Sequence, residues 1–103
     1  MAIEFTKLQG AGNDYIAIDG RTRNLNWPKI AVEMSKPAFG VGSDGIVLVQ
    51  NSTHAQIRMR VYNPDGSEAE MSGNGIRLFT KFVVDKKIAL PNNNKLTIET
   101  GGG

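Results

Sequence analysis

Alternating apolar and polar residues along the chain predict a series of short β-strands. The alternation is clearest over residues 56–63, where one side carries Ile57, Met59 and Val61 and the other carries Arg58, Arg60 and Tyr62. Residues 45–50 form a continuous apolar run typical of a buried strand, and the short connection 51–55 predicts that these two strands pair as an antiparallel hairpin. Further strands are expected within 3–8, at 15–18 and at 96–100, with a loop over 10–14.

Two segments have the spacing and end signals of α-helices. Asn26 can cap a helix over 27–35, because Pro28 stands near its first position and Pro37 follows its end. A second helix is expected over 74–86, where apolar side chains recur at helical spacing around much of the circumference. Several strands and one strongly apolar helix predict an α+β fold, in which a curled, largely antiparallel sheet wraps around that central helix.

Composition narrows the function classes without selecting one. The chain has 103 residues, 40% of them hydrophobic and 21% charged, as expected for a single globular domain. A formal charge of +2, with Lys86 and Lys87 as the only adjacent basic pair, gives no indication of nucleic-acid binding. There are no cysteines for disulfides, no signal-peptide pattern at the amino terminus and no apolar run long enough to span a membrane, so a cytoplasmic protein is expected.

The most informative segment runs from residue 63 to residue 77. Asn63 precedes a Pro-Asp-Gly turn, and Ser72 stands just before a glycine-flanked helix start at Gly73-Asn-Gly75. Helix amino termini carry backbone N–H groups that are not bonded within the helix, and glycines let an anion approach them closely. The pattern therefore predicts a pocket for a carboxylate beside Ser72.

Each of these residues also has a purely structural interpretation. Ser72 and Asn74 could cap an ordinary helix entry, while Asn63 and Asn13 could be turn residues. The Ser67–Glu70 spacing fits a capping box, although it falls ahead of the expected helix. The glycine loop 40–45 lacks the lysine of a phosphate-binding loop and does not lead into a helix, so we interpret it as a loop lining the site.

Three blocks in order resemble the diaminopimelate epimerase family over essentially the whole chain. They are Lys7-Leu-Gln-Gly-Ala-Gly-Asn-Asp-Tyr15, Gly40-Val-Gly-Ser-Asp-Gly45 and Asn63-Pro-Asp-Gly-Ser-Glu-Ala-Glu-Met-Ser-Gly-Asn-Gly-Ile-Arg77. The resemblance implies interconversion of LL- and meso-diaminopimelate in lysine biosynthesis, without a cofactor or a metal. It assigns the catalytic cysteine position to Ser72 and substrate contacts to Asn13, Asn63, Gly73 and Asn74.

The same resemblance implies two similar domains, each a curled sheet around a central helix, with the substrate between them. Residues 1–103 then form the amino-terminal domain, and the second domain is absent from this chain. A half of this kind is expected to expose an inner face, which either receives the missing domain or self-associates. Neither nucleic acid nor membrane is expected as a partner.

Ser72 is the departure that affects the chemistry most. Epimerisation needs a base on each face of the α-carbon, and a thiol serves because its pKa is about 8.5 and falls at helix amino termini. A serine hydroxyl needs a separate base. His54, the single histidine, is expected to be a solvent-exposed loop residue, so we expect the isolated chain to be inactive.

Two alternatives to this interpretation stay open. One is a related enzyme of the same architecture, such as a proline racemase or a phenazine-biosynthesis isomerase. The other is a domain without catalytic activity that binds an amino acid or a partner domain through its exposed inner face.

Overall fold

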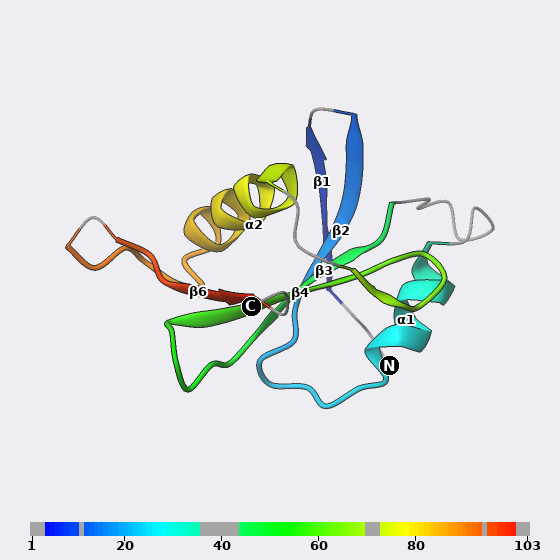
Figure 1. Cartoon of the computed structure of the whole chain (residues 1–103), viewed down its shortest axis with the longest axis horizontal. Coiled ribbons are helices and arrows are strands. Elements are labelled where there is room, and N and C mark those ends of the chain that lie inside the picture. Colours follow the sequence, from blue (N-terminus) through cyan, green and yellow to red (C-terminus); the bar gives the residue numbers. More distant parts are fainter. Residues whose placement is uncertain (1–3, 11, 36–43, 70–72, 94, 101–103) are drawn as a thin grey trace.

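A computed structural model describes residues 4–10, 12–35, 44–69, 73–93 and 95–100. These residues form six strands and two helices, which confirms the α+β class (Figure 1). In chain order the elements are β1 (Thr6–Gly10), β2 (Asn13–Asp19), α1 (Trp27–Met34), β3 (Ile46–Gln50), β4 (Ile57–Tyr62), β5 (Glu68–Ala69), α2 (Gly73–Asp85) and β6 (Ile98–Thr100).

All six strands belong to one sheet with β3 at its centre. The order along the sheet is β1-β2-β3-β4-β5, and β6 pairs with the other end of β4. The pairs β1–β2, β3–β4 and β4–β5 are antiparallel, so the predicted hairpin of the strands within 45–63 is confirmed. The pairs β2–β3 and β4–β6 are parallel, and each of these connections includes a helix, as parallel neighbours require.

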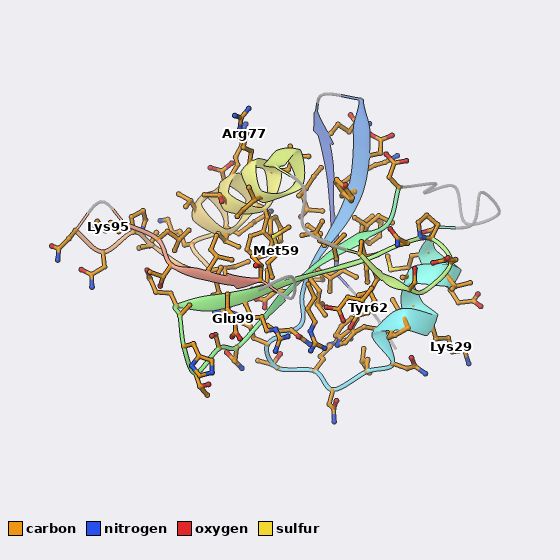
Figure 2. The ribbon with its side chains drawn as sticks, viewed as in Figure 1. Lys29, Met59, Tyr62, Arg77, Lys95 and Glu99 are labelled. Carbon is orange, nitrogen blue, oxygen red and sulfur yellow. The ribbon has the colours of Figure 1, made fainter. Side chains whose placement is uncertain are left out.

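Helices cover both faces of the sheet, which explains why β3 is apolar at successive positions. Val47 and Val49 point into a core that they share with α2, whereas Ile46 and Leu48 point into a second core beneath α1. Along β4 the same alternation places Met59 on the α2 side and Tyr62 on the α1 side (Figure 2). A strand buried on both faces has no need for polar positions.

Helix α2 lies between the β1–β2 hairpin and the β6 segment, so the sheet curls around it (Figure 1). Its inward residues Phe79, Phe82 and Val83 are buried in the core, as their helical spacing predicts. Its outward side stays exposed, however, and Arg77 points away from the sheet (Figure 2). The helix is therefore amphipathic, with one covered side and one open side.

Local signals placed the helix boundaries to within a residue. The side-chain oxygen of Asn26 accepts a hydrogen bond from the backbone nitrogen of Lys29 at 3.3 Å, as expected for an amino-terminal cap. Proline stands at the predicted position in the first turn, and Ser35 is the carboxy-terminal cap. Helix α2 begins at Gly73 and ends at Asp85, where we expected 74 and 86.

Two expectations about strands need correction, and one strand was not expected. The predicted loop 10–14 is mostly strand, because Gly10 pairs with Asn13 and Gln9 with Asp14 in a tight β1–β2 hairpin. The last strand begins at Ile98 and not at residue 96. The two-residue strand β5 gave no periodic signal, because it is too short to alternate. In the described part of the chain, neither helix has the length and apolarity to cross a lipid bilayer.

Candidate active site

The strand register brings the sequence-predicted segments to one end of the sheet. Ile16 of β2, Ile46 of β3 and Tyr62 of β4 lie side by side in one row. Because β2 and β3 are parallel, both begin at this end, while the antiparallel β4 ends there. Asn13, the carboxy-terminal part of the glycine loop and Asn63 therefore lie toward the same end of the sheet, although they are far apart in the sequence.

Asp44 connects the glycine loop to the start of β2 through two hydrogen bonds. The backbone nitrogen of Asp14 donates to Oδ2 of Asp44 at 2.8 Å, and the backbone nitrogen of Asp44 donates to the carbonyl oxygen of Asp14 at 2.7 Å. The Ile16 nitrogen then donates to the carbonyl of Gly45 at 3.1 Å, which continues the ladder into the sheet. This double contact fixes the backbone directly after Asn13.

Gly45 is in close contact with the end of β4. Its φ of +138° lies in the region that favours glycine. A Cβ atom at this position would stand 2.2 Å from the carbonyl oxygen of Tyr62 and 3.4 Å from Cα of Asn63. Only a residue without a side chain allows the backbone at position 45 to approach Asn63 this closely. Residues 40–43, the rest of the predicted glycine loop, lie outside the described residues.

Asn63 opens a tight turn whose geometry is fixed by main-chain and side-chain hydrogen bonds. Its backbone nitrogen donates to the carbonyl of Ser67 at 2.7 Å, and its carbonyl accepts from the Gly66 nitrogen at 2.9 Å. Its Nδ2 donates to Oγ of Ser67 at 3.0 Å. The Ser67 hydroxyl donates to Oδ1 of Asp65 at 2.6 Å, and this bond, with one from the Ser67 nitrogen, lowers the pKa of Asp65.

Helix α2 starts near the β1–β2 hairpin (Figure 1). Gly73 and Asn74 are its first two residues, so both belong to the first turn, where the helix dipole favours an anion. The helix packs against β1 at Gly10, where a Cβ atom would come within 3.1 Å of Leu78 Cδ2. The predicted catalytic position, Ser72, lies outside the described residues.

The described residues near this end of the sheet offer polar groups from a strand, a turn and a helix start. An amide side chain at Asn63, a positioned backbone at Asn13 and a helix amino terminus supply donors and acceptors without a metal ligand set. Within residues 4–10, 12–35, 44–69, 73–93 and 95–100, no group of three or more histidine, aspartate or glutamate side chains is arranged to hold a metal ion. His54 is exposed in the β3–β4 connection, as predicted.

Sequence reasoning missed three supporting residues of this site. Asp44 bonds with a residue thirty positions away, and no local pattern shows such a contact. Asp65 and Ser67 lie in the predicted turn, yet their role toward the Asn63 side chain becomes visible only in the structure. The alternative assignment of Ser67 to a capping box is wrong, since its hydroxyl bonds to Asp65 and helix α2 begins six residues later.

Known structures show the class of fold that carries this site. The phenazine biosynthesis protein of the PhzF family from Bacillus anthracis superposes with a TM-score of 0.70 at 24% identity, and the match covers 98% of this chain and 32% of that one. The PhzF-family protein from Enterococcus faecalis gives 0.69 at 14% identity, over 100% of this chain and 38% of that one. The chain thus shares the α+β fold of the PhzF proteins.

Within that fold, sequence similarity identifies the family. The diaminopimelate epimerase family model matches residues 5–103, so the chain belongs to this family. The diaminopimelate epimerase of Methanococcus maripaludis is 47% identical over 102 residues, which are 98% of this chain and 36% of the relative. That of Agathobacter rectalis is 44% identical over 102 residues, covering 98% and 35%. The chain spans about a third of the length of these relatives.

Proposed function

We propose that this chain supplies half of the active site of a cofactor-independent diaminopimelate epimerase. The whole protein would interconvert LL- and meso-diaminopimelate in cytoplasmic lysine biosynthesis, by removing the α-proton and returning it on the opposite face. The observation that supports the proposal is the strand register, which puts the start of β2 after Asn13 and the end of β4 before Asn63 toward the same end of the sheet, in a chain of this family.

In this proposal each candidate residue has a distinct task. Asn13 and Asn63 bind polar groups of the substrate, and the first-turn backbone at Gly73 and Asn74 holds its α-carboxylate. Such donors stabilise the negative charge that develops when the proton leaves, most strongly in a site that excludes water. Ser72 occupies the position of one of the two bases.

The second base and the other wall of the site would come from a further domain, because the relatives are nearly three times as long as the aligned region. An open groove of about 710 Å³ between α2 and the β6 segment is a surface on which that domain could pack. Its apolar lining consists of Ile76, Val84, Leu96 and Ile98. Self-association through this face is the other expected outcome for the isolated chain.

Activity depends on residue 72. Losing a positioned general base typically costs about 10²–10⁴ in rate, so a serine at this position should leave little activity. The decisive experiment joins the chain to the remaining two thirds of the Methanococcus maripaludis relative and compares Ser72 with Ser72→Cys. Exchange of the α-proton of LL-diaminopimelate in D₂O, followed by NMR, is the measurement.

We expect Ser72→Cys to raise the exchange rate by about two orders of magnitude or more. The matched control is Ser52→Cys, which adds a thiol in the β3–β4 connection and should leave the rate unchanged. Equal rates for Ser72 and Ser72→Cys would refute the proposal for this residue. Racemisation of proline or isomerisation of a phenazine precursor by the same protein would favour the alternative suggested by the PhzF fold. Ligand binding without proton exchange would favour a binding domain.

A further inference from the structure

The side-chain amide of Asn63 is held in one orientation by a chain of two hydrogen bonds. Nδ2 of Asn63 lies 3.0 Å from Oγ of Ser67, and that oxygen lies 2.6 Å from Oδ1 of Asp65. The Ser67 backbone nitrogen also donates to the same carboxylate oxygen at 2.9 Å. Three side chains within five residues therefore form a continuous relay.

The chemistry of the three groups fixes the direction of each bond. An ionised carboxylate only accepts, so the single hydroxyl proton of Ser67 must point to Asp65. The Ser67 oxygen is then left as an acceptor toward Asn63, and only the NH₂ end of the amide can donate to it. The side-chain oxygen Oδ1 of Asn63 is the end of the amide that the relay does not use.

The backbone of the turn is held separately from this relay. The Asn63 nitrogen donates to the Ser67 carbonyl, and the Gly66 nitrogen donates to the Asn63 carbonyl. Neither of these bonds uses a side chain. Removing the Ser67 hydroxyl should therefore free the Asn63 amide while the turn keeps its main-chain hydrogen bonds.

We propose that Asp65 and Ser67 are positioning residues, which orient the side-chain amide of Asn63 toward the bound ligand. This inference rests on the proposed function, in which Asn63 contacts the substrate. The rotation of a free asparagine amide would present its nitrogen or its oxygen to the ligand, whereas the relay selects one end before the ligand arrives. Preorganisation of this kind strengthens binding because less order is lost on association.

The first test follows the Asn63 side-chain NH₂ resonances by NMR in the 103-residue chain. In Ser67→Ala we expect these resonances to move and their exchange with water to rise about tenfold, as for loss of one hydrogen bond to a polar partner. The backbone amides of Asn63 and Gly66 should keep their protection. Ser67→Thr, which retains a hydroxyl, should restore the original signals.

A matched control exists at the far end of the sheet. Oγ of Ser52 donates to Oε1 of Glu99 at 2.6 Å, so Ser52→Ala removes the same kind of serine–carboxylate bond away from the site. It should leave the Asn63 signals unchanged. Asn63 side-chain resonances that are the same in Ser67→Ala and in the original chain would overturn the inference, as would equal shifts in Ser52→Ala.

The second test uses the two-domain protein carrying Ser72→Cys. Adding Ser67→Ala should raise KM for diaminopimelate about tenfold while kcat changes less than about twofold, because the lost contact acts on ground state and transition state alike. Adding Ser52→Ala should change neither. If KM stays constant although the NMR signals move, the relay stabilises the turn and does not position a ligand contact. An inactive two-domain protein would refute the proposed function, and the NMR test would still decide whether the relay orients Asn63.

Discussion

Replacing Gly45 by alanine perturbs the point where the glycine loop, β2 and β4 meet. The residue has a φ of +138°, and an added Cβ would stand 2.2 Å from the Tyr62 carbonyl oxygen. That oxygen belongs to the backbone of β4, whose register with β3 and β5 leaves it little freedom to move. The clash must therefore be relieved by shifting a strand and not by rotating a side chain.

Two costs add up in the Gly45→Ala variant. A non-glycine residue in this backbone conformation costs about 1–3 kcal/mol. Overpacking a well-filled site costs about 1–3 kcal/mol more. The expected loss of unfolding free energy is thus about 2–6 kcal/mol, against a total of about 5–15 kcal/mol for a typical domain. Gly12→Ala separates the two terms, because Gly12 has a φ of +83° but nothing within 4 Å of an added Cβ. It should cost only about 1–2 kcal/mol.

Urea unfolding of both variants measures the difference directly. Trp27 is the single tryptophan and is 4% exposed, so its fluorescence reports loss of the core beneath α1. We expect the urea concentration at the unfolding midpoint to be lower for Gly45→Ala than for Gly12→Ala. The dependence of the unfolding free energy on urea concentration should be similar in the two variants. If both variants lose the same stability, the close approach between the glycine loop and β4 is wrong, and the geometry of the candidate site with it.

Three further predictions test other parts of the structure. Phe79→Ala empties a fully buried position between α2 and the sheet, and calorimetry should show a loss of about 3–5 kcal/mol. Asp19 accepts hydrogen bonds from the Arg21 guanidinium at 2.8 and 2.9 Å, and these lower the pKa of the carboxylate. Because the folded pKa is lowered, the stabilisation is present above the ordinary aspartate pKa of about 3.9 and is lost as the pH falls below it. The two side chains are about one third exposed. In urea titrations the unfolding free energy of the original chain should therefore exceed that of Asp19→Asn by at most about 1 kcal/mol at pH 7, and this difference should shrink below pH 4. A difference that grows on acidification would contradict this assignment. Asp44→Ala removes the carboxylate that accepts from the Asp14 nitrogen. Loss of one hydrogen bond worth about 1 kcal/mol should accelerate hydrogen exchange at the Asp14 amide about fivefold or more. Unchanged exchange at this amide would exclude the contact.

Sequence reasoning succeeded where the signal lies within a few residues. The cap at Asn26 and the helical spacing of Phe79, Phe82 and Val83 each depend on neighbours one or two turns away. The strand over 56–63 was predicted from alternation alone. Its pairing with the preceding strand was predicted from the short connection between them. The motif around residue 72 also showed the family, because its residue types and order are specific.

Sequence reasoning failed where partners lie far apart in the chain. The parallel pairs β2–β3 and β4–β6 were not anticipated, since periodicity states which side of a strand is apolar but not which strand lies beside it. The loop expected over 10–14 is shorter than predicted, because strand pairing extends to Gly10 and Asn13 while Gly12, with a φ of +83°, lies in the turn between them. The prediction for Ser72 remains a prediction.

By itself, the sequence determined the types and approximate limits of most elements, the amphipathic faces that form the core, and the candidate residues for a carboxylate pocket. Only the tertiary structure decided that Asp44 holds the start of β2 and that Gly45 closely approaches the end of β4 beside Asn63. The physical reason is the range of the interactions. Helical spacing, strand alternation and capping act over a few residues of chain, whereas sheet pairing and the contacts of Asp44 and Gly45 join residues that lie far apart in the sequence.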